Sequence, residues 1–162
     1  MSLRVVQWAT GNIGTRSLRE VIRHPDLELV GLLVYDPAKN GVDAGELCGE
    51  PATGVLATTD RQGAIDLEAD CVLYMPRAVD VDEVVAMLSR GTNVVSTCGD
   101  LQAAGALLSP DDRQRLLDAC RAGGSSLYAT GSSPGFITEA LPVVLLSPQQ
   151  RKRVVEGKRG DD

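Results

Sequence analysis

The sequence predicts an α/β fold, in which an open and mostly parallel sheet carries helices on its faces. Short apolar segments alternate with amphipathic segments of helical periodicity along most of the chain. A tight glycine turn follows the first apolar segment directly. The second apolar segment, residues 27–35, is apolar almost throughout, as expected for a parallel strand that is covered on both faces. Together these observations predict a series of β–α units.

Length and composition limit the function classes. The 162 residues predict one domain with a substantial core, and the formal net charge of −6 with only 3% aromatic residues argues against nucleic-acid binding. No apolar run is long enough to span a membrane and no signal-peptide pattern opens the chain, so we expect a soluble, cytoplasmic protein. The four cysteines are singly spaced and there is one histidine, so no metal site is predicted.

The start of the chain contains the first candidate binding site. An apolar run from Leu3 predicts a strand, and a glycine turn leads from it into a predicted helix over Thr15–His24. In such a turn Gly11 would let the backbone approach a pyrophosphate, and Gly14 would let the helix pack closely on the strand. Ala9 stands where the usual three-glycine pattern has its first glycine, so the match to that pattern is partial.

The end of the second predicted strand is the second candidate site. Asp36 lies 22 positions beyond Gly14, where an acid in a dinucleotide fold accepts hydrogen bonds from the adenosine ribose. Lys39 would instead meet a 2′-phosphate, so NAD and NADP both stay open. A purely structural interpretation of Asp36 is that it forms a turn before Pro37.

Further strands and helices follow in alternation. Four strands are predicted from short apolar runs, at residues 54–59, 70–75, 92–97 and 126–130. Residues 80–90 predict a helix, and a second begins after Ser109, a good N-cap that is followed by a proline and two acids. We expect this second helix to turn Leu116, Leu117 and Cys120 inward. Residues 40–54, which are rich in glycine and small polar residues, predict a surface loop with one helical turn.

This alternation sets the expected domain organisation. About six strands separated by helices are typical of a Rossmann-type dinucleotide-binding domain, doubly wound and mostly parallel. We assign residues 1–148 to this NAD(P)-binding domain. Residues 149–162 become abruptly charged and are interpreted as a frayed tail, or as an element without its packing partner.

Several motifs together resemble one known family. In chain order they are QWATGNIGTRSLRE, DAGELCG, STCGDL and ATGSSPGFITEALP. With them the sequence resembles the dihydrodipicolinate reductase-like NAD(P)-dependent oxidoreductases, most closely the branch of 2,4-diaminopentanoate dehydrogenase and the native amine dehydrogenases. Members of the family are roughly twice this long. The resemblance therefore implies that this chain corresponds to their N-terminal domain, that the substrate domain is absent, and that residues 149–162 are its stub.

The resemblance also implies a set of site residues. Cofactor contacts are expected at Gly11, Asn12, Ile13 and Gly14 for the pyrophosphate, Asp36 and Lys39 for the adenosine ribose or its phosphate, Pro76 and Arg77 for the nicotinamide-side ribose, and Thr97, Cys98, Gly99, Ser133 and Pro134 around the nicotinamide. Asp100 is the nearest acid to the place where amine-active relatives carry a glutamate, and it is the candidate catalytic residue. Plainer interpretations are a loop acid or helix cap for Asp100, a surface charge for Arg77 and an inert thiol for Cys98.

Two functions follow as expectations. The resemblance implies hydride transfer to or from an imine or amine, with NAD or NADP as cofactor and a small amine or carbonyl compound as substrate. The alternative is a truncated dinucleotide-binding module or pseudoenzyme that acts by binding or through a protein partner. In that case the apolar segment 136–146 would offer a surface for a homo-oligomer or for such a partner.

Overall fold

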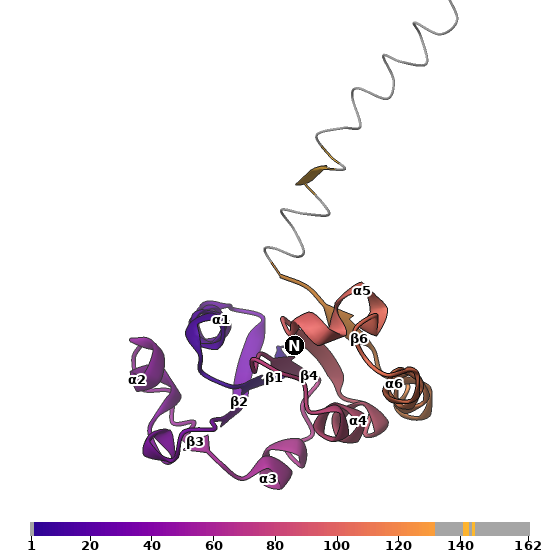
Figure 1. The fold of residues 1–162 in the computed structure, drawn as a ribbon. Helices are drawn as coiled ribbons and strands as arrows, with labels where there is room; N and C mark the ends of the chain where they lie inside the picture. The colour runs from indigo at the N-terminus through magenta and orange to yellow at the C-terminus, as the bar shows by residue number, and fades with distance from the viewer. Residues whose placement is uncertain (1, 132–140, 143, 145–162) are drawn as a thin grey trace, which may run out of the picture. The chain divides into compact units, whose positions relative to one another are not determined.

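The computed structural model describes residues 2–131, 141, 142 and 144. Residues 1–129 form one unit and residues 130–162 a second, and the elements named below belong to the first. Six strands form one sheet in the order β3-β2-β1-β4-β5-β6, and each neighbouring pair in it is parallel. This order is that of a doubly wound Rossmann-type sheet, so the predicted fold class is confirmed (Figure 1).

The elements agree with the expected alternation. The strands are β1 Leu3–Trp8, β2 Leu27–Leu33, β3 Ala57–Thr58, β4 Cys71–Tyr74, β5 Asn93–Ser96 and β6 Leu127–Ala129. The helices are α1 Asn12–Arg23, α2 Ala44–Cys48, α3 Arg61–Ile65, α4 Val81–Ser89, α5 Gln102–Gly105 and α6 Pro110–Gly123, with single 3-10 turns η1 at Pro37–Lys39 and η2 at Gly99–Leu101. Sequence periodicity does not predict α3 or α5, because neither helix is long enough to display a repeating apolar face.

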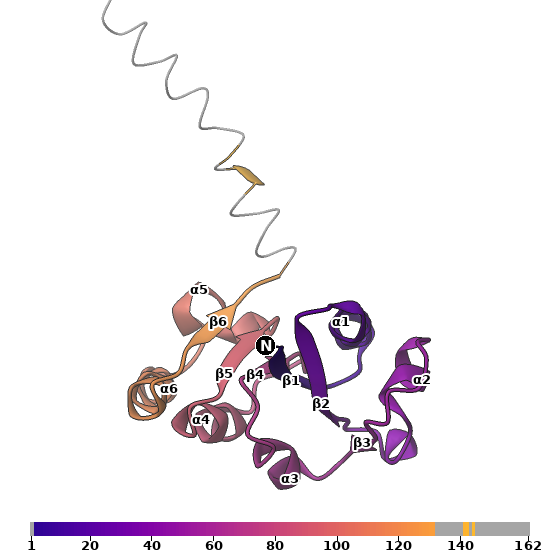
Figure 2. The same ribbon diagram turned by 180° about the vertical axis from the view of Figure 1, so that it is seen from behind.

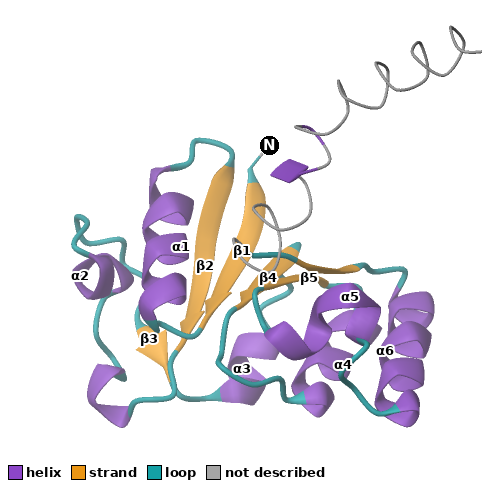
Figure 3. Cartoon of the chain, turned by 45° about the horizontal axis from the view of Figure 1, so that its top comes forward, coloured by secondary structure: helices purple, strands orange, loops and turns teal. Residues whose placement is uncertain are grey.

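Helices cover the two faces of the sheet in separate groups. Figures 2 and 3 show α1 and α2 on one side, and α3, α4 and α6 on the other. The strands supply both cores, because successive side chains point to opposite faces: Leu33 belongs to one cluster, Leu32 and Val34 to the other. Among the described residues, no helix is long and apolar enough to cross a membrane.

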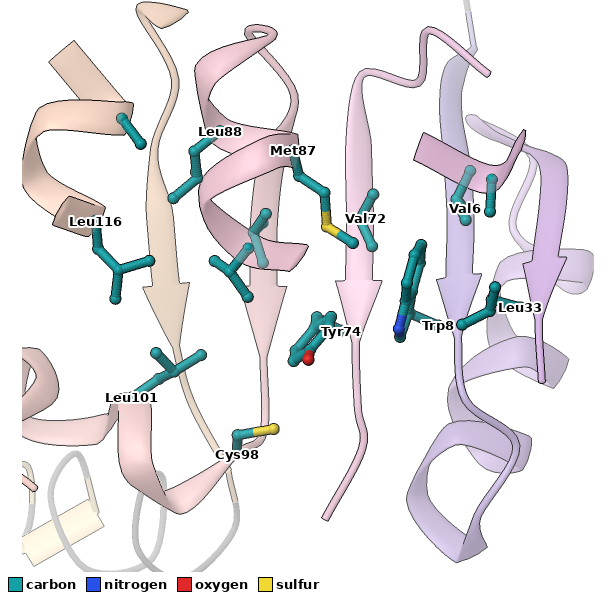
Figure 4. Close-up of a cluster of buried hydrophobic side chains, with 14 residues drawn as sticks. Val6, Trp8, Leu33, Val72, Tyr74, Met87, Leu88, Cys98, Leu101 and Leu116 are labelled. Atoms are coloured by element: carbon teal, nitrogen blue, oxygen red, sulfur yellow. The ribbon is translucent and has the colours of Figure 1, made fainter. Parts of the chain in front are cut away.

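The larger core lies between the sheet and the second group of helices (Figure 4). Trp8 of β1 and Tyr74 of β4 are fully buried there, with ring centroids 6.0 Å apart. Leu116 of α6 is buried as predicted, whereas Leu117 is 44% exposed, so its predicted burial is wrong. The inward positions of α6 are Leu116 and Ala119, three residues apart, and Leu117 is rotated about 100° away from Leu116.

One carboxylate organises the loop around α2. The carboxylate of Asp43 accepts hydrogen bonds from the backbone N–H groups of Thr53 at 3.0 Å, Gly45 at 2.7 Å and Gly54 at 2.8 Å. These hydrogen bonds lower the pKa of Asp43 below its ordinary value of 3.8, and the bond from Thr53 has the largest effect. The loop is thus closed by an ionised side chain.

This arrangement predicts a pH-dependent contribution to stability. A pKa that is lower in the folded state stabilises the fold above the unfolded value of 3.8, and the contribution is lost as pH falls through the folded pKa. We expect the wild-type protein to exceed Asp43→Asn in unfolding free energy at neutral pH, and the gap to narrow below about pH 4. Urea denaturation from pH 7 to pH 3 checks this, and a gap that stays constant with pH would contradict it.

Candidate functional site

A cleft of about 560 Å³ opens at the carboxyl ends of β1, β2 and β4. The chain runs from β1 to β2 in one direction across the sheet and from β4 to β5 in the other, so the cleft lies where the strand order reverses. Doubly wound sheets bind their ligands at this place. Of the predicted cofactor-binding residues, five line this cleft: Gly11, Asp36, Lys39, Pro76 and Arg77.

The two glycines of the turn differ in what the fold requires of them. A Cβ atom on Gly14 would lie 2.1 Å from the carbonyl oxygen of Ala9, so only glycine lets α1 approach β1 this closely. A Cβ atom on Gly11 would meet no atom within 4 Å, and its φ of −72° suits any residue. The packing of the protein alone therefore requires Gly14 but not Gly11, and the backbone at Gly11 is open to a ligand.

The turn keeps its shape without the first glycine of the pattern. Ala9 adopts a left-handed φ of 76°, which disfavours a side-chain-bearing residue by about 1 kcal/mol. Beneath it, the fully buried Gln7 donates its Nε2 to the carbonyl oxygens of Ala9 at 3.1 Å and Leu73 at 3.4 Å. This side chain braces the conformation that a glycine would adopt freely.

The N-terminus of α1 is suited to an anion. Gly11 is its N-cap and provides no side-chain hydrogen bond, and the first turn has no acidic residue. By contrast, Asp or Ser side chains cap α2, α3, α4 and α6. The exposed first turn at Asn12 and Ile13 thus presents backbone N–H groups and the positive end of the helix dipole. This is an environment that fits a diphosphate.

Asp36 and Lys39 lie together on the wall formed after β2. The carboxylate of Asp36 accepts a hydrogen bond from the N–H of Ala38 at 3.0 Å, which is the turn-forming role, and its side chain is exposed in the cleft. The ammonium of Lys39 donates to the carbonyl oxygen and the hydroxyl of Thr10, at 3.2 and 3.0 Å. Lys39 therefore bridges this wall to the glycine turn.

A partly buried polar network, not anticipated from the sequence, adjoins the cleft, which Tyr35, Arg61 and Glu83 line. Glu83 of α4 is only 7% exposed, and its Oε2 accepts hydrogen bonds from the hydroxyls of Tyr74 at 2.9 Å and Tyr35 at 3.4 Å. The indole N–H of Trp8 donates to the Tyr35 oxygen at 3.0 Å. Burial, together with the charge of Glu83, raises the pKa of Tyr74, so this hydroxyl stays protonated at neutral pH. The second oxygen of Glu83 lies 3.0 Å from the Arg61 guanidinium.

One sequence signal points to this network. The chain has only five aromatic residues, and three of them, Trp8, Tyr35 and Tyr74, lie at or just after the carboxyl ends of β1, β2 and β4. Parallel strands bring these ends to one edge of the sheet, so the clustering follows from the fold. The participation of Glu83 and Arg61 has no comparable signal, because both come from helices whose facing depends on tertiary packing.

The residues expected beside the nicotinamide lie after β5. Cys98 is 1% exposed and its thiol donates to the carbonyl oxygen of Pro76 at 3.0 Å; burial raises the pKa of this thiol, which argues against a nucleophilic role. Asp100 accepts a hydrogen bond from the N–H of Val79 at 3.4 Å. These contacts join the ends of β4 and β5 beside the cleft. Ser133 and Pro134 lie outside the described residues, as does most of the segment 136–146.

Comparison with curated proteins finds similarity to oxidoreductases. It is 37% identical over 150 residues to an amine dehydrogenase of Streptomyces virginiae, a match that spans 88% of this chain and 41% of that protein. The resemblance to the dihydrodipicolinate reductase-like oxidoreductases, on their amine dehydrogenase branch, is thereby confirmed. A 4-hydroxy-tetrahydrodipicolinate reductase of Synechocystis is 35% identical over 63 residues, which are 39% of this chain and 23% of that enzyme. No protein-family model matches. The chain spans about two fifths of the length of the amine dehydrogenase.

Solved structures agree with the fold. An amine dehydrogenase of Mycobacterium smegmatis superposes with a TM-score of 0.71 at 19% identity, over 81% of this chain and 40% of that protein. A Synechocystis biliverdin reductase, solved with biliverdin and NADP⁺, gives 0.62 at 21% identity, over 79% and 37% of the two chains. GenD2 from gentamicin A biosynthesis, solved with NAD, gives 0.59 at 19% identity, over 79% and 34%. At these identities the comparison shows a shared fold.

Proposed function

We propose that this chain binds a nicotinamide dinucleotide in the cleft at the ends of β1, β2 and β4. The observation that carries the proposal is the turn at Gly11. There an N-terminus of α1 without a side-chain cap opens on the cleft, at a glycine that the packing of the protein does not require. Two proteins of similar fold support this assignment, because the biliverdin reductase was solved with NADP⁺ and GenD2 with NAD.

The residues around the cleft have distinct roles in this proposal. The first turn of α1 would hold the diphosphate by backbone N–H groups, and Asp36 or Lys39 would contact the adenosine ribose or its phosphate. Pro76 and Arg77 would face the second ribose. The loop after β5 would border the nicotinamide, with Asp100 positioning it through its bond to the backbone after β4. When bound, the cofactor supplies or accepts a hydride, while the protein orients it.

For the reaction we propose hydride transfer to or from an imine or amine, as part of an NAD(P)-dependent oxidoreductase. The 37% identity to an amine dehydrogenase supports this class. The alternative from the sequence is a dinucleotide-binding module without turnover. Assays of purified protein with amines, and with carbonyl compounds plus ammonia, separate the two: binding with turnover favours the enzyme, and binding alone favours the module.

Calorimetric titration with NADH and with NADPH tests the site directly. We expect a dissociation constant in the micromolar range for one or both. If Asp36 accepts hydrogen bonds from the ribose, Asp36→Ala should weaken NADH binding about tenfold and NADPH binding less, because a charged hydrogen bond is lost only where the 2′-hydroxyl is free. Equal losses would remove Asp36 from this role, and no binding of either dinucleotide would overturn the proposed function.

A further inference from the structure

The proposed function gives no role to Arg61 and Glu83, although both line the cleft. A carboxylate buried to the extent of Glu83 is unfavourable unless it is paired and hydrogen-bonded, and apolar packing does not require one. Resting on the proposed function, we infer that Arg61 is the platform on which the adenine ring of the dinucleotide stacks. Glu83 holds the Arg61 guanidinium in position for this contact.

The geometry around Arg61 already contains one stacking contact. Arg61 is the first residue of α3, and its guanidinium carbon lies 5.3 Å from the centroid of the Tyr35 ring. That distance is within the range of cation–π contacts. A guanidinium is planar and delocalised, so it can lie against an aromatic ring on either side. Arg61 lines the cleft and its side chain is 53% exposed, so a base that enters the cleft can reach the guanidinium.

The distribution of charge favours a base over a phosphate as the partner of Arg61. Its Nη1 lies 3.0 Å from Oε1 of Glu83 and 3.6 Å from Oδ2 of Asp80, so two carboxylates together more than offset its single positive charge. Lys39, by contrast, donates to two neutral oxygens of Thr10. Lys39 makes no ion pair within the part of the chain that the structure describes, so a 2′-phosphate would be drawn to its ammonium. A neutral aromatic ring is compatible with a guanidinium that already has two carboxylates beside it.

The platform is supported by the core. The Tyr35 oxygen is held between the indole N–H of Trp8, at 3.0 Å, and Oε2 of Glu83, at 3.4 Å. Trp8 is itself fully buried. The Tyr35 ring beneath the guanidinium is therefore held at its hydroxyl end before a ligand arrives, which reduces the conformational freedom lost on binding.

Substitution of Arg61 combined with fragments of the dinucleotide tests the inference. Arg61→Ala should weaken the binding of NADH, NADPH and AMP by a similar factor, about tenfold, because all three molecules contain adenine. Reduced nicotinamide mononucleotide, which lacks adenine, should bind the variant and the wild-type protein equally. A loss confined to NADPH would show a phosphate contact instead and would overturn the inference, as would unchanged affinity for AMP.

Two further variants separate stacking from charge and from general damage. Arg61→Lys keeps the charge opposite Glu83 but removes the planar group, so it should lose affinity nearly as Arg61→Ala does; full retention would contradict stacking. Arg90→Ala is the matched control, since Arg90 is similarly exposed and pairs with Asp66 outside the cleft, and it should leave affinity unchanged. If wild-type protein binds no dinucleotide, the proposed function fails; AMP binding that depends on Arg61 would then still support the platform, and its absence would overturn it.

Discussion

Gly14→Ala is expected to destabilise the protein by about 3 kcal/mol and to lower its melting temperature by roughly 10 °C. The added Cβ would lie 2.1 Å from the carbonyl oxygen of Ala9 and 2.9 Å from its carbonyl carbon. Neither is the end of a flexible side chain, so α1 or the turn itself must move away. The fully buried Gln7 braces this turn, and its Nε2 lies 3.3 Å from the same Cβ position, so the displacement would disturb its hydrogen bonds as well.

Urea and thermal denaturation of Gly14→Ala and Gly11→Ala compare the stabilities of two variants that add the same group to one turn. Gly11→Ala adds the same methyl group three residues earlier in the same turn, where no atom lies within 4 Å and φ is −72°. Its effect should stay below about 1 kcal/mol, which is the size of an altered helix cap. A Gly14 variant as stable as the Gly11 variant would show that α1 does not pack on β1 as described.

Gly11→Val is expected to weaken dinucleotide binding at least tenfold, about 1.4 kcal/mol, while leaving most of the stability intact. The valine side chain would occupy the open space beside the N-terminus of α1, through which a diphosphate must approach the backbone N–H groups. NADH and NADPH should be affected equally, because both contain the diphosphate. This separates Gly11→Val from Asp36→Ala, for which the two losses should differ.

Graded side-chain size provides the control for this effect. Gly11→Ala should lose less affinity than Gly11→Val, because the space excluded by the side chain grows between them. Titrations are interpreted alongside melting curves, so that an unfolded fraction is not mistaken for weak binding. Full affinity in a folded Gly11→Val protein would place the diphosphate elsewhere and would count against the proposed cleft.

Part of the candidate site could be predicted because its residues follow strands directly. Gly11 comes soon after β1, Asp36 soon after β2 and Pro76 soon after β4, and the carboxyl ends of parallel strands meet at one edge. The motif also predicted different roles for its two glycines: close helix packing for Gly14 and an open approach to the backbone for Gly11. Asp36 and Lys39 both line the cleft, as their positions soon after β2 predicted.

Local sequence patterns predicted most elements of the fold: the six strands, the glycine turn, and helices such as α6, whose start is encoded in Ser109 and Pro110. These features depend on contiguous residues, through periodicity, capping and turn chemistry. By contrast, packing between distant segments brings Arg61, Tyr35 and Glu83 together and leaves Leu117 exposed. Those outcomes depend on how α3, α4 and α6 are rotated against the sheet, and that rotation is set by packing between segments far apart in the chain.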